Sequence, residues 1–422
     1  MRFLSRRLLC VAAVGVLMAG VVGCSGSKSS GVTINWWHIS TTDPGLTIWK
    51  NAAAAYTKSH PNVHIKITVL ENEAFKSKLQ TELAAGRVPD LFQSWGGGTM
   101  AAQADAGMLK DITADIAPWA NELNAGAMSV YQYKGKQYGV PWDMGMIGFF
   151  YNKALFQQAG ITGTPATYDD LLTDVDKLKA AGIVPYALAG KDEWPGMHFW
   201  TYLVLRSGGS AALAQMIQSK NWNTDACKAG GAAVQQLVAK SPFQPGFLSA
   251  VYDKGEAATM GNGQAAMELM GQWGQSVEVA NSTSGKGIGD NLGWFAFPAV
   301  TGGAGKATDG VGGGNGIAVG KNAPKEAVDF LHYLVGTEVA SKVGSSGLGL
   351  PPTKTAESSV TDPILKQILA ARGQADFFQL YLDQATSPAM GAAINDATAG
   401  LFAGTSTPEQ VCQAITTAAQ QE

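Results

Sequence analysis

Strand and helix patterns alternate along residues 32–94, and this alternation limits the possible folds more than any other feature of the 422-residue chain. Residues 63–69 place apolar side chains at every second position, which predicts a half-buried strand. Residues 73–85 bring their apolar side chains to one face of a helix. With further strand patterns at 32–37 and 90–94, the order is β-α-β-α-β. Short links in this order predict a mostly parallel sheet covered by helices.

The expected carboxyl ends of these three strands carry aromatic, amide and carboxylate side chains. In open sheets of parallel strands, ligands bind beyond these ends. We therefore predict that this edge of the first sheet forms part of a binding site. The candidate side chains are Trp37, Glu71, Asn72, Gln93, Ser94 and Trp95.

The segment Gly139–Lys153 reads as a boundary between two parts of the fold. Pro141 ends a strand, Trp142 and Asp143 follow it, and an apolar run over 144–151 predicts a buried strand. Asn152 is a typical N-cap for the next helix. We expect the chain to leave one lobe here and to enter a second, with Trp142 at the hinge and Trp142 and Asp143 facing a cleft.

A second α/β pattern follows, with a helix at 169–181 and strands at 184–189, 265–270 and 292–297. The Gly-rich stretch 301–316 predicts a flexible passage, and 344–352 is rich in Gly and Pro. The sequence thus favours two interleaved α/β lobes joined near Trp142, Gly312 and Leu350. The expected boundaries are 32–142 and 313–350 for the first lobe, and 143–312 and 351–422 for the second.

The N-terminus has the features of an export signal. Three Arg residues precede an apolar run over 8–22, and small residues precede Cys24. We expect residues 1–23 to be a lipoprotein signal peptide, Cys24 to carry lipid and the Ser/Gly-rich 24–31 to be a tether. The mature chain would then lie on the extracytoplasmic face of the cell membrane. The alternative is an uncleaved transmembrane anchor.

Composition narrows the classes of partner. The formal net charge is −3, and it falls to −6 once residues 1–23, with three Arg and no acid, are removed. This acidic balance argues against nucleic acid as a partner. A mature chain of nearly 400 residues is too long for one ordinary core and suggests two domains.

Cysteine and histidine usage points to no metal or other cofactor. Beyond the N-terminal region only Cys227 and Cys412 remain, and they form either a disulfide, which export permits, or two buried thiols. The five His residues are scattered and match no metal-binding spacing. The run 310–316 lacks the third Gly of a dinucleotide-binding loop.

Tryptophans outside helix-core spacing point to carbohydrate. Trp95, Trp142, Trp194 and Trp273 each adjoin Gly, Pro or charge in a loop context. A pyranose packs its C–H face on an aromatic ring and bonds its hydroxyls to planar polar groups. We therefore predict a neutral-sugar site. Trp49, Trp119, Trp222 and Trp294 fit a core, whereas Trp37 and Trp200 fit either place.

An enzyme is the alternative from another class. A glycoside hydrolase needs two opposed carboxylates at a set separation. The candidates near expected strand ends are Glu71, Glu73, Asp143 and Glu193.

Five sequence motifs, taken together and in their order along the chain, indicate a family resemblance. They are Thr33–Trp37, Ala85–Leu91, Tyr138–Trp142 with Phe150–Lys153, Met270–Trp273 and Gly312–Ile317. With them, the mature chain resembles the extracellular solute-binding lipoproteins of ABC sugar importers, the maltose-binding-protein-like family. The resemblance implies a non-enzymatic, monomeric protein of periplasmic-binding-protein fold. Its two lobes would close over sugar and deliver it to membrane permease subunits. A sensor that reports to a membrane kinase is an alternative on the same fold.

Within that family, residues 71–76 and 92–98 look most like xylo-oligosaccharide-binding proteins, and binders of chito-oligosaccharides or α-glucosides share the frame. The resemblance implies that Trp142, Trp194 and Trp273 stack on sugar rings. It implies hydroxyl contacts from Asn72, Gln93, Ser94 and Asp143. Gly313 and Asn315, in the Gly312–Ile317 motif, complete the candidates.

Overall fold

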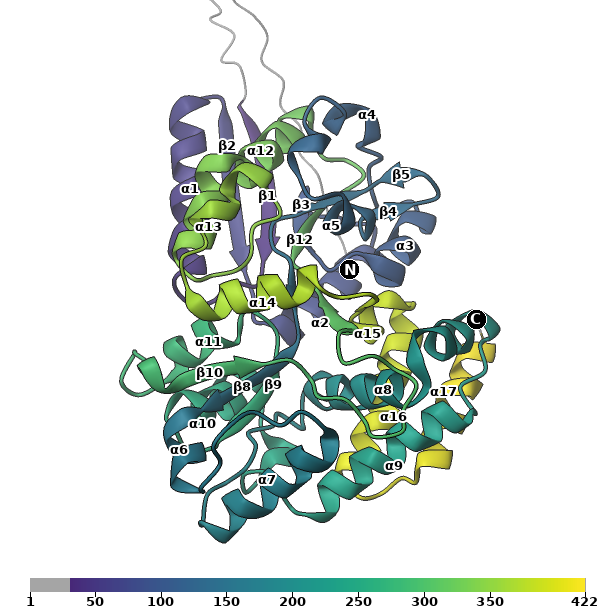
Figure 1. Ribbon diagram of the computed structural model, residues 1–422. Coiled ribbons are helices and arrows are strands. Elements are labelled where there is room, and N and C mark those ends of the chain that lie inside the picture. Colours follow the sequence, from purple (N-terminus) through teal and green to yellow (C-terminus); the bar gives the residue numbers. More distant parts are fainter. Residues whose placement is uncertain (1–30, 422) are drawn as a thin grey trace, which may run out of the picture.

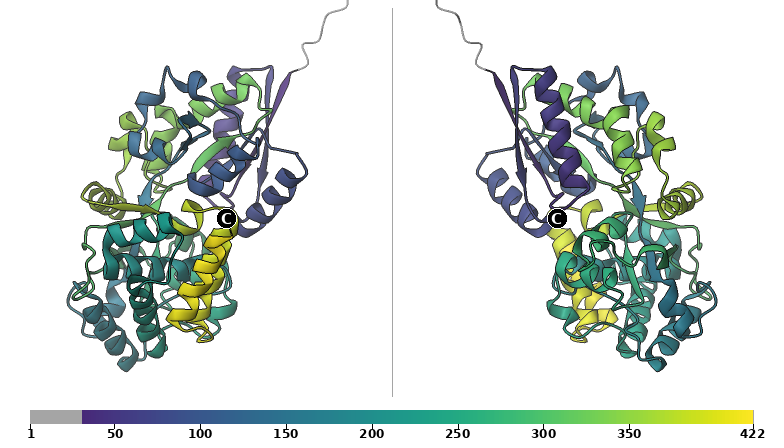
Figure 2. Two further views of the ribbon diagram at one scale, coloured as in Figure 1. Left: turned by 90° about the vertical axis from the view of Figure 1, so that its right-hand side faces the viewer. Right: turned by 90° about the vertical axis from the view of Figure 1, so that its left-hand side faces the viewer.

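The computed structural model describes residues 31–421 and shows two lobes, between which the chain passes three times (Figure 1). Figure 2 shows the lobes from the side, with the last helices against the second lobe. The expected signal peptide, the lipid site Cys24 and nearly all of the expected tether lie outside the described residues. The two-lobed α/β fold is confirmed.

The first lobe is built on a five-stranded sheet in the order β2-β1-β3-β12-β6. Strands β1 (Val32–His38), β2 (Val63–Val69) and β3 (Leu91–Ser94) run parallel, as the alternation predicts. Strands β12 (Gly316–Val319) and β6 (Gly139–Pro141) flank the passages between lobes and pair antiparallel.

Helices cover both faces of this sheet. In α1 (Gly45–Ser59), buried Trp49, Ala52, Ala53 and Tyr56 form one apolar stripe, and Trp49 packs edge-on against Trp36 of β1 with ring centroids 5.8 Å apart. The other elements of this lobe are α2 (Asn72–Ala84), α3 (Gly97–Asp105), α4 (Thr113–Ile116), η1 (Ala120–Glu122), α5 (Ala125–Ser129), the hairpin β4 (Gln132–Tyr133) and β5 (Lys136–Gln137), α12 (Lys325–Val335), α13 (Thr337–Ser345) and η5 (Lys354–Ser359).

The second lobe departs from the expected mostly parallel sheet. Strand β8 (Gly148–Asn152) lies between β9 (Met267–Met270) and β10 (Leu292–Phe295) and is antiparallel to both. In a second small sheet, β11 (Gly310–Gly313) pairs parallel with β13 (Phe378–Leu380). The expectation of a mostly parallel sheet is wrong here because several helices separate consecutive strands, so alternation no longer fixes strand direction.

The remaining strand of that small sheet is β7 (Gly145–Met146), which is antiparallel to β11. The helices of this lobe are α6 (Lys153–Gln158), α7 (Tyr168–Ala180), α8 (Trp194–Ser219), α9 (Asp225–Ala239), η2 (Phe247–Ser249), η3 (Tyr252–Ala257, a π-helix), α10 (Ala258–Gly261), α11 (Gly274–Asn281), η4 (Gly289–Asn291), α14 (Pro363–Gly373), α15 (Leu382–Ala385), α16 (Pro388–Phe402) and α17 (Pro408–Gln420).

Two local expectations change for clear reasons. Residues 184–189 are extended but form only isolated bridges, since Pro185 cannot donate to a ladder. The Gly-rich stretch 301–316 is not a flexible passage throughout, because it contains the buried strand β11. A Cβ on Gly312 would lie 2.7 Å from the carbonyl oxygen of Gly145, so glycine lets these strands approach.

The passages between lobes differ slightly from the expected boundaries. Gly313 belongs to β11 of the second lobe, and the chain reaches the first lobe with β12. After Leu350 the chain stays on the first lobe for about ten residues: the hydroxyl of Thr353 donates to the carbonyl of Val335 at 2.6 Å. The passage into the second lobe follows η5 and comes later than expected because η5 packs on α13.

The two remaining cysteines form a disulfide, which answers the question that spacing alone left open. Cys227 of α9 and Cys412 of α17 have Cα atoms 6.1 Å apart. The bond joins segments 185 positions apart within the second lobe. In the described part of the chain, every helix is too short or too polar to cross a membrane.

Candidate binding cleft between the lobes

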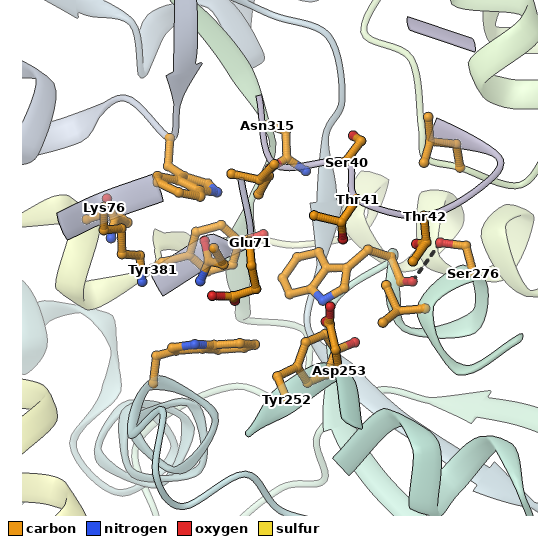
Figure 3. Close-up of a pocket in the computed structure, with 18 of the residues that line it drawn as sticks. Ser40, Thr41, Thr42, Glu71, Lys76, Tyr252, Asp253, Ser276, Asn315 and Tyr381 are labelled. Atoms are coloured by element: carbon orange, nitrogen blue, oxygen red, sulfur yellow. Dashed lines mark hydrogen bonds between the residues drawn. The ribbon is translucent and has the colours of Figure 1, made fainter. Parts of the chain in front are cut away.

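An open cavity lies between the lobes and takes its walls from both (Figure 3). The first lobe supplies residues 39–43 after β1, the start of α2, Trp95 and Trp142. The second lobe supplies the walls described next. Ser40 and Thr41 face Tyr252 and Asp253 across the cavity.

The second lobe presents a connected aromatic wall. Trp194 opens α8, Tyr252 opens the π-helix, Trp273 precedes α11 and Tyr381 follows β13. Their ring centroids are 5.2 Å apart for Trp194 and Tyr252, and 6.0 Å apart for Trp273 and Tyr381. On the first lobe, Trp95 packs edge-on against Phe75. Ring faces and edges are thus available from both sides of the cleft.

Five buried polar atoms of the cleft lining have no hydrogen-bond partner within the described chain. They are Asn72 Oδ1, Trp194 Nε1, His198 Nδ1, Tyr252 Oη and Tyr381 Oη. Such an atom costs about 1–3 kcal/mol when it stays unbonded. Both donors and acceptors are present, so the lining fits an occupant that itself donates and accepts many hydrogen bonds.

Burial keeps the rings of this set uncharged. It lowers the pKa of His198 to about 3 and raises the pKa of Tyr252 and Tyr381 above the usual range. Near neutral pH the imidazole is therefore neutral and both phenols are protonated. These groups suit hydroxyls better than ions.

The charged groups at the cleft are largely committed to local structure. The carboxylate of Glu71 accepts from the backbone N–H of Glu73 and Ala74 and so caps α2. Asp43 accepts from Thr47 N at 3.0 Å, and Lys76 pairs with Glu73 at 2.9 Å. Burial raises the pKa of Asp253. Among described residues, no three His, Cys, Asp or Glu side chains are placed to hold a metal ion.

The acids expected for a hydrolase do not meet in the cleft. Of Glu71, Glu73, Asp143 and Glu193, only Glu71 lines the cavity, and it is the helix cap. Burial, with Asp396 beside it, raises the pKa of Glu193 to about 7, but Glu193 lies outside the lining. The opposed pair that glycoside hydrolysis needs is not assembled from these residues.

Seven of the twelve candidate ligand residues line the cavity: Glu71, Asn72, Trp95, Trp142, Trp194, Trp273 and Asn315. Trp37 does not, because side chains alternate along β1 and Trp37 faces α2, where Lys78 Nζ lies 5.3 Å from its ring. Gln93 is 3% exposed and donates to Asn315 Oδ1 at 2.7 Å. Ser94 accepts from Gly96 N.

Asp143 and Gly313 also lie outside the cleft lining, which corrects the expectation for both. They border a separate cavity at the hinge. The Asp143 carboxylate is 1% exposed and is bonded inward to other hinge segments, so it is not free for a ligand in the cleft.

Trp142 was expected both at the hinge and facing the cleft, and the structure shows each of these roles only in part. Its backbone N–H donates to Asn315 O at 2.9 Å, at the first passage between lobes. Its side chain is 8% exposed and packs edge-on against Trp49 in the first-lobe core, with ring centroids 5.0 Å apart. Only the remaining edge reaches the cavity, because Trp49 covers much of the ring.

Sequence reasoning missed His198, Tyr252, Asp253 and Tyr381. His198 lies one helical turn after Trp194, a spacing that could have paired them, but α8 is apolar all round and hid the face. Tyr252 begins a π-helix, a feature often found at functional sites that propensity does not predict. Tyr381 follows a strand of three residues, too short for a pattern.

Residues 38–341 match the profile of the bacterial extracellular solute-binding protein family. The chain belongs to this family. The match covers both lobes and the first two passages between them.

Related chains and structures agree with this assignment. The solute-binding protein is 26% identical over 388 residues to an uncharacterized ABC-transporter extracellular-binding protein of Pyrococcus horikoshii, covering 87% of this chain and 83% of the relative. It is 24% identical to the multiple sugar-binding protein of Streptococcus mutans, covering 84% of each.

Two solved structures share the fold over nearly the whole chain. One comes from a study of xylan utilization by Caldanaerobius polysaccharolyticus, with a TM-score of 0.86, 28% identity and coverage of 92% of this chain and 99% of that chain. The other is a chitin oligosaccharide binding protein, with a TM-score of 0.84, 25% identity and coverage of 93% and 99%. The family is extracellular, so this solute-binding protein works outside the cytoplasm.

Proposed function

We propose that this protein is the substrate-binding component of an ABC importer and captures a neutral oligosaccharide between its lobes. The observation that carries the proposal is the set of five unpartnered polar atoms beside an aromatic wall. A sugar satisfies both, because its hydroxyls donate and accept while its C–H faces pack on rings. Sugar-binding relatives over most of the chain support the same class.

The preferred ligand class is xylobiose or a longer xylo-oligosaccharide. Support comes from the likeness to the structure from the xylan-utilization study. Chito-oligosaccharides are the second candidate, because a chitin oligosaccharide binding protein and a diacetylchitobiose binding protein of Streptomyces coelicolor are also similar. The protein would act as a monomer, held at the membrane by lipid on Cys24, and deliver its ligand to permease subunits.

Binding to both lobes supplies the mechanism. A ligand that contacts both walls does so fully only when the lobes are closed, so it shifts the population toward the closed form. The closed form then presents a defined surface to the permease.

The test is a thermal-shift screen followed by calorimetry with xylobiose, xylotriose, chitobiose, chitotriose and maltose. A ligand that binds only the folded state raises the apparent melting temperature. We expect a clear rise with one of the oligosaccharide series and none with charged sugars such as glucuronate. Analysis of the incubated sugar should show no cleavage. Absence of any shift across the neutral sugars would sink the proposal, and sustained cleavage would favour a hydrolase.

A further inference from the structure

Asp143 lies where the three passages between lobes meet. Its carboxylate accepts hydrogen bonds from Asn315 Nδ2 at 2.9 Å and from the backbone N–H of Leu350 at 2.8 Å. Asn315 belongs to the second passage, and Leu350 precedes the third. The side-chain amide of Gln272 also donates to this carboxylate. One buried group therefore holds segments that are far apart in the sequence.

The bonds extend into both walls of the cleft. On the first-lobe side, Gln93 of β3 donates to Asn315 Oδ1 at 2.7 Å. On the second-lobe side, Gln272 directly precedes Trp273 of the aromatic wall. The side chains thus form a continuous relay from the first-lobe sheet to the second-lobe wall, in the order Gln93, Asn315, Asp143 and Gln272.

Glycines make this close meeting possible. A Cβ on Gly349 would lie 2.5 Å from Asp143 Oδ1, and one on Gly314 would lie 2.0 Å from the carbonyl oxygen of Asp143. A Cβ on Gly145 would overlap the side-chain amide of Gln272. Each of the three chain segments that meet here carries a glycine at the contact, so the backbones touch the relay without intervening side chains.

The carboxylate is held by neutral donors alone. Among the described residues no Lys or Arg forms an ion pair with Asp143. The nearby Arg372 guanidinium instead donates to the carbonyl of Gly145 at 2.8 Å. A buried carboxylate without a cation depends on its N–H donors. A movement of the lobes that removed one of these donors would therefore cost free energy.

We propose that Asp143 is a positioning residue that couples the ligand-binding wall at Trp273 to closure of the lobes. The inference rests on the proposed function, because it assigns Asp143 to the closing motion and not to ligand contact. Gln272 belongs to the second lobe, whereas Asn315 and Leu350 lie in or next to the passages, so a rotation of the lobes would move Gln272 relative to them. The full set of donors is therefore available only in the arrangement seen here, and losing it favours the open form.

The test is Asp143→Asn in the full chain, with small-angle scattering of the ligand-free protein and calorimetry for every ligand the wild type binds. The side-chain amide of Asn would direct its own N–H groups at the N–H donors of its neighbours, so the hydrogen bonds that Asp143 accepts could not all form. We expect the ligand-free protein to become more extended. We also expect affinity to fall about 10- to 100-fold, by a similar factor for each ligand.

Two further variants keep the test decisive. Gln272→Met keeps the side-chain length but removes one donor, and it should shift scattering and affinity in the same direction if Asp143→Asn folds poorly. Asp174→Asn, at a buried aspartate of α7 far from the passages, should change neither. Unchanged scattering in both relay variants, or a loss limited to particular ligands, would overturn the inference. The scattering comparison needs no ligand, so it stands even if the sugar proposal fails.

Discussion

Trp273 offers the most available ring of the second-lobe wall. It is half-buried, lies directly over Gly271, and has Trp194 and Tyr381 at its edges. A Cβ on Gly271 would lie 2.1 Å from the indole, so glycine is what permits the ring to lie flat on the backbone. The backbone and its neighbours therefore fix the ring position before any ligand arrives.

We expect Trp273→Ala to weaken oligosaccharide binding by about 10- to 100-fold, because it removes a stacking surface worth roughly 1–3 kcal/mol. The unliganded protein should keep its melting temperature within a few degrees, since the ring is partly solvent-exposed. Calorimetry and thermal unfolding measure the two effects. Trp37→Ala is the matched control: it removes an indole of similar burial outside the cleft and should leave affinity unchanged. Equal losses in both variants would refute the role of Trp273.

Individual cleft-lining residues were predictable where a loop context exposes a large ring. Trp95, Trp194 and Trp273 each adjoin Gly, Pro or charge, and each lines the cavity. Strand-end residues were less predictable. Which side chain reaches the cleft depends on strand register, and neither Trp37 nor Gln93 lines it.

At the scale of elements, helix α3 of the first lobe meets α15 of the second across the cleft mouth. A Cβ on Gly98 would lie 2.5 Å from the carbonyl oxygen of Thr386, and one on Gly97 would lie 2.5 Å from that of Gln384. The hydroxyl of Thr99 donates to Thr386 O at 3.5 Å. The two lobes therefore touch backbone to backbone at the glycine-rich start of α3.

We predict that Gly98→Ala weakens ligand binding without weakening the fold. Gly98 lies in a helix and outside the left-handed region, so alanine fits the lobe itself. In the arrangement of the lobes seen here its methyl group would overlap Thr386, so this contact between the lobes should open and affinity should fall at least tenfold. Thermal unfolding without ligand and calorimetry separate the effects. Gly373→Ala, at the open end of α14, is the control. Wild-type affinity in Gly98→Ala would show that closure does not need this contact.

Elements with long patterns were predictable and short ones were not. The helix expected at 169–181 occurs as α7, and the expected N-cap Asn152 accepts from Ala154 N and Leu155 N. Helix α3 was hidden because its Gly-rich start reads as a loop.

At the scale of the whole molecule, the second lobe contains three buried carboxyl groups beneath the cleft. Glu256, Glu268 and Glu278 are each 0–1% exposed and come from the π-helix, β9 and α11. No Lys or Arg of the described chain pairs with them, and at least one oxygen of each lacks a partner. Burial raises the pKa of all three, that of Glu268 to about 7.

This burial predicts that the protein is more stable in mild acid than in base. A carboxyl whose folded pKa exceeds its unfolded value stabilises the fold at low pH, and this contribution is lost as pH rises through the folded pKa. The free energy of unfolding should therefore fall by about 1–3 kcal/mol between pH 5 and pH 8. Urea denaturation across this range measures it, and Glu268→Gln should flatten the slope. A rise in stability toward pH 8 would contradict the prediction.

The two-lobe architecture was predictable because the chain length, the β-α-β-α-β order at the start and the strand end at Pro141 all favour it. Strand directions in the second lobe were not, since β8, β9 and β10 are separated by long helical segments that allow either direction. The late third passage depends on packing between η5 and α13, which residue patterns do not encode.

The disulfide and the three passages together affect the order in which the molecule can be completed. The first lobe lacks β12 and α13 until residue 345 has been made, and the second lacks α17 until residue 420. Cys227 finds its partner only with that last helix. A growing chain therefore exposes unfinished sheet faces for most of its synthesis. Such a chain is suited to export in an unfolded state. Both lobes would then complete their folding, and the disulfide would form, in the oxidising space beyond the membrane.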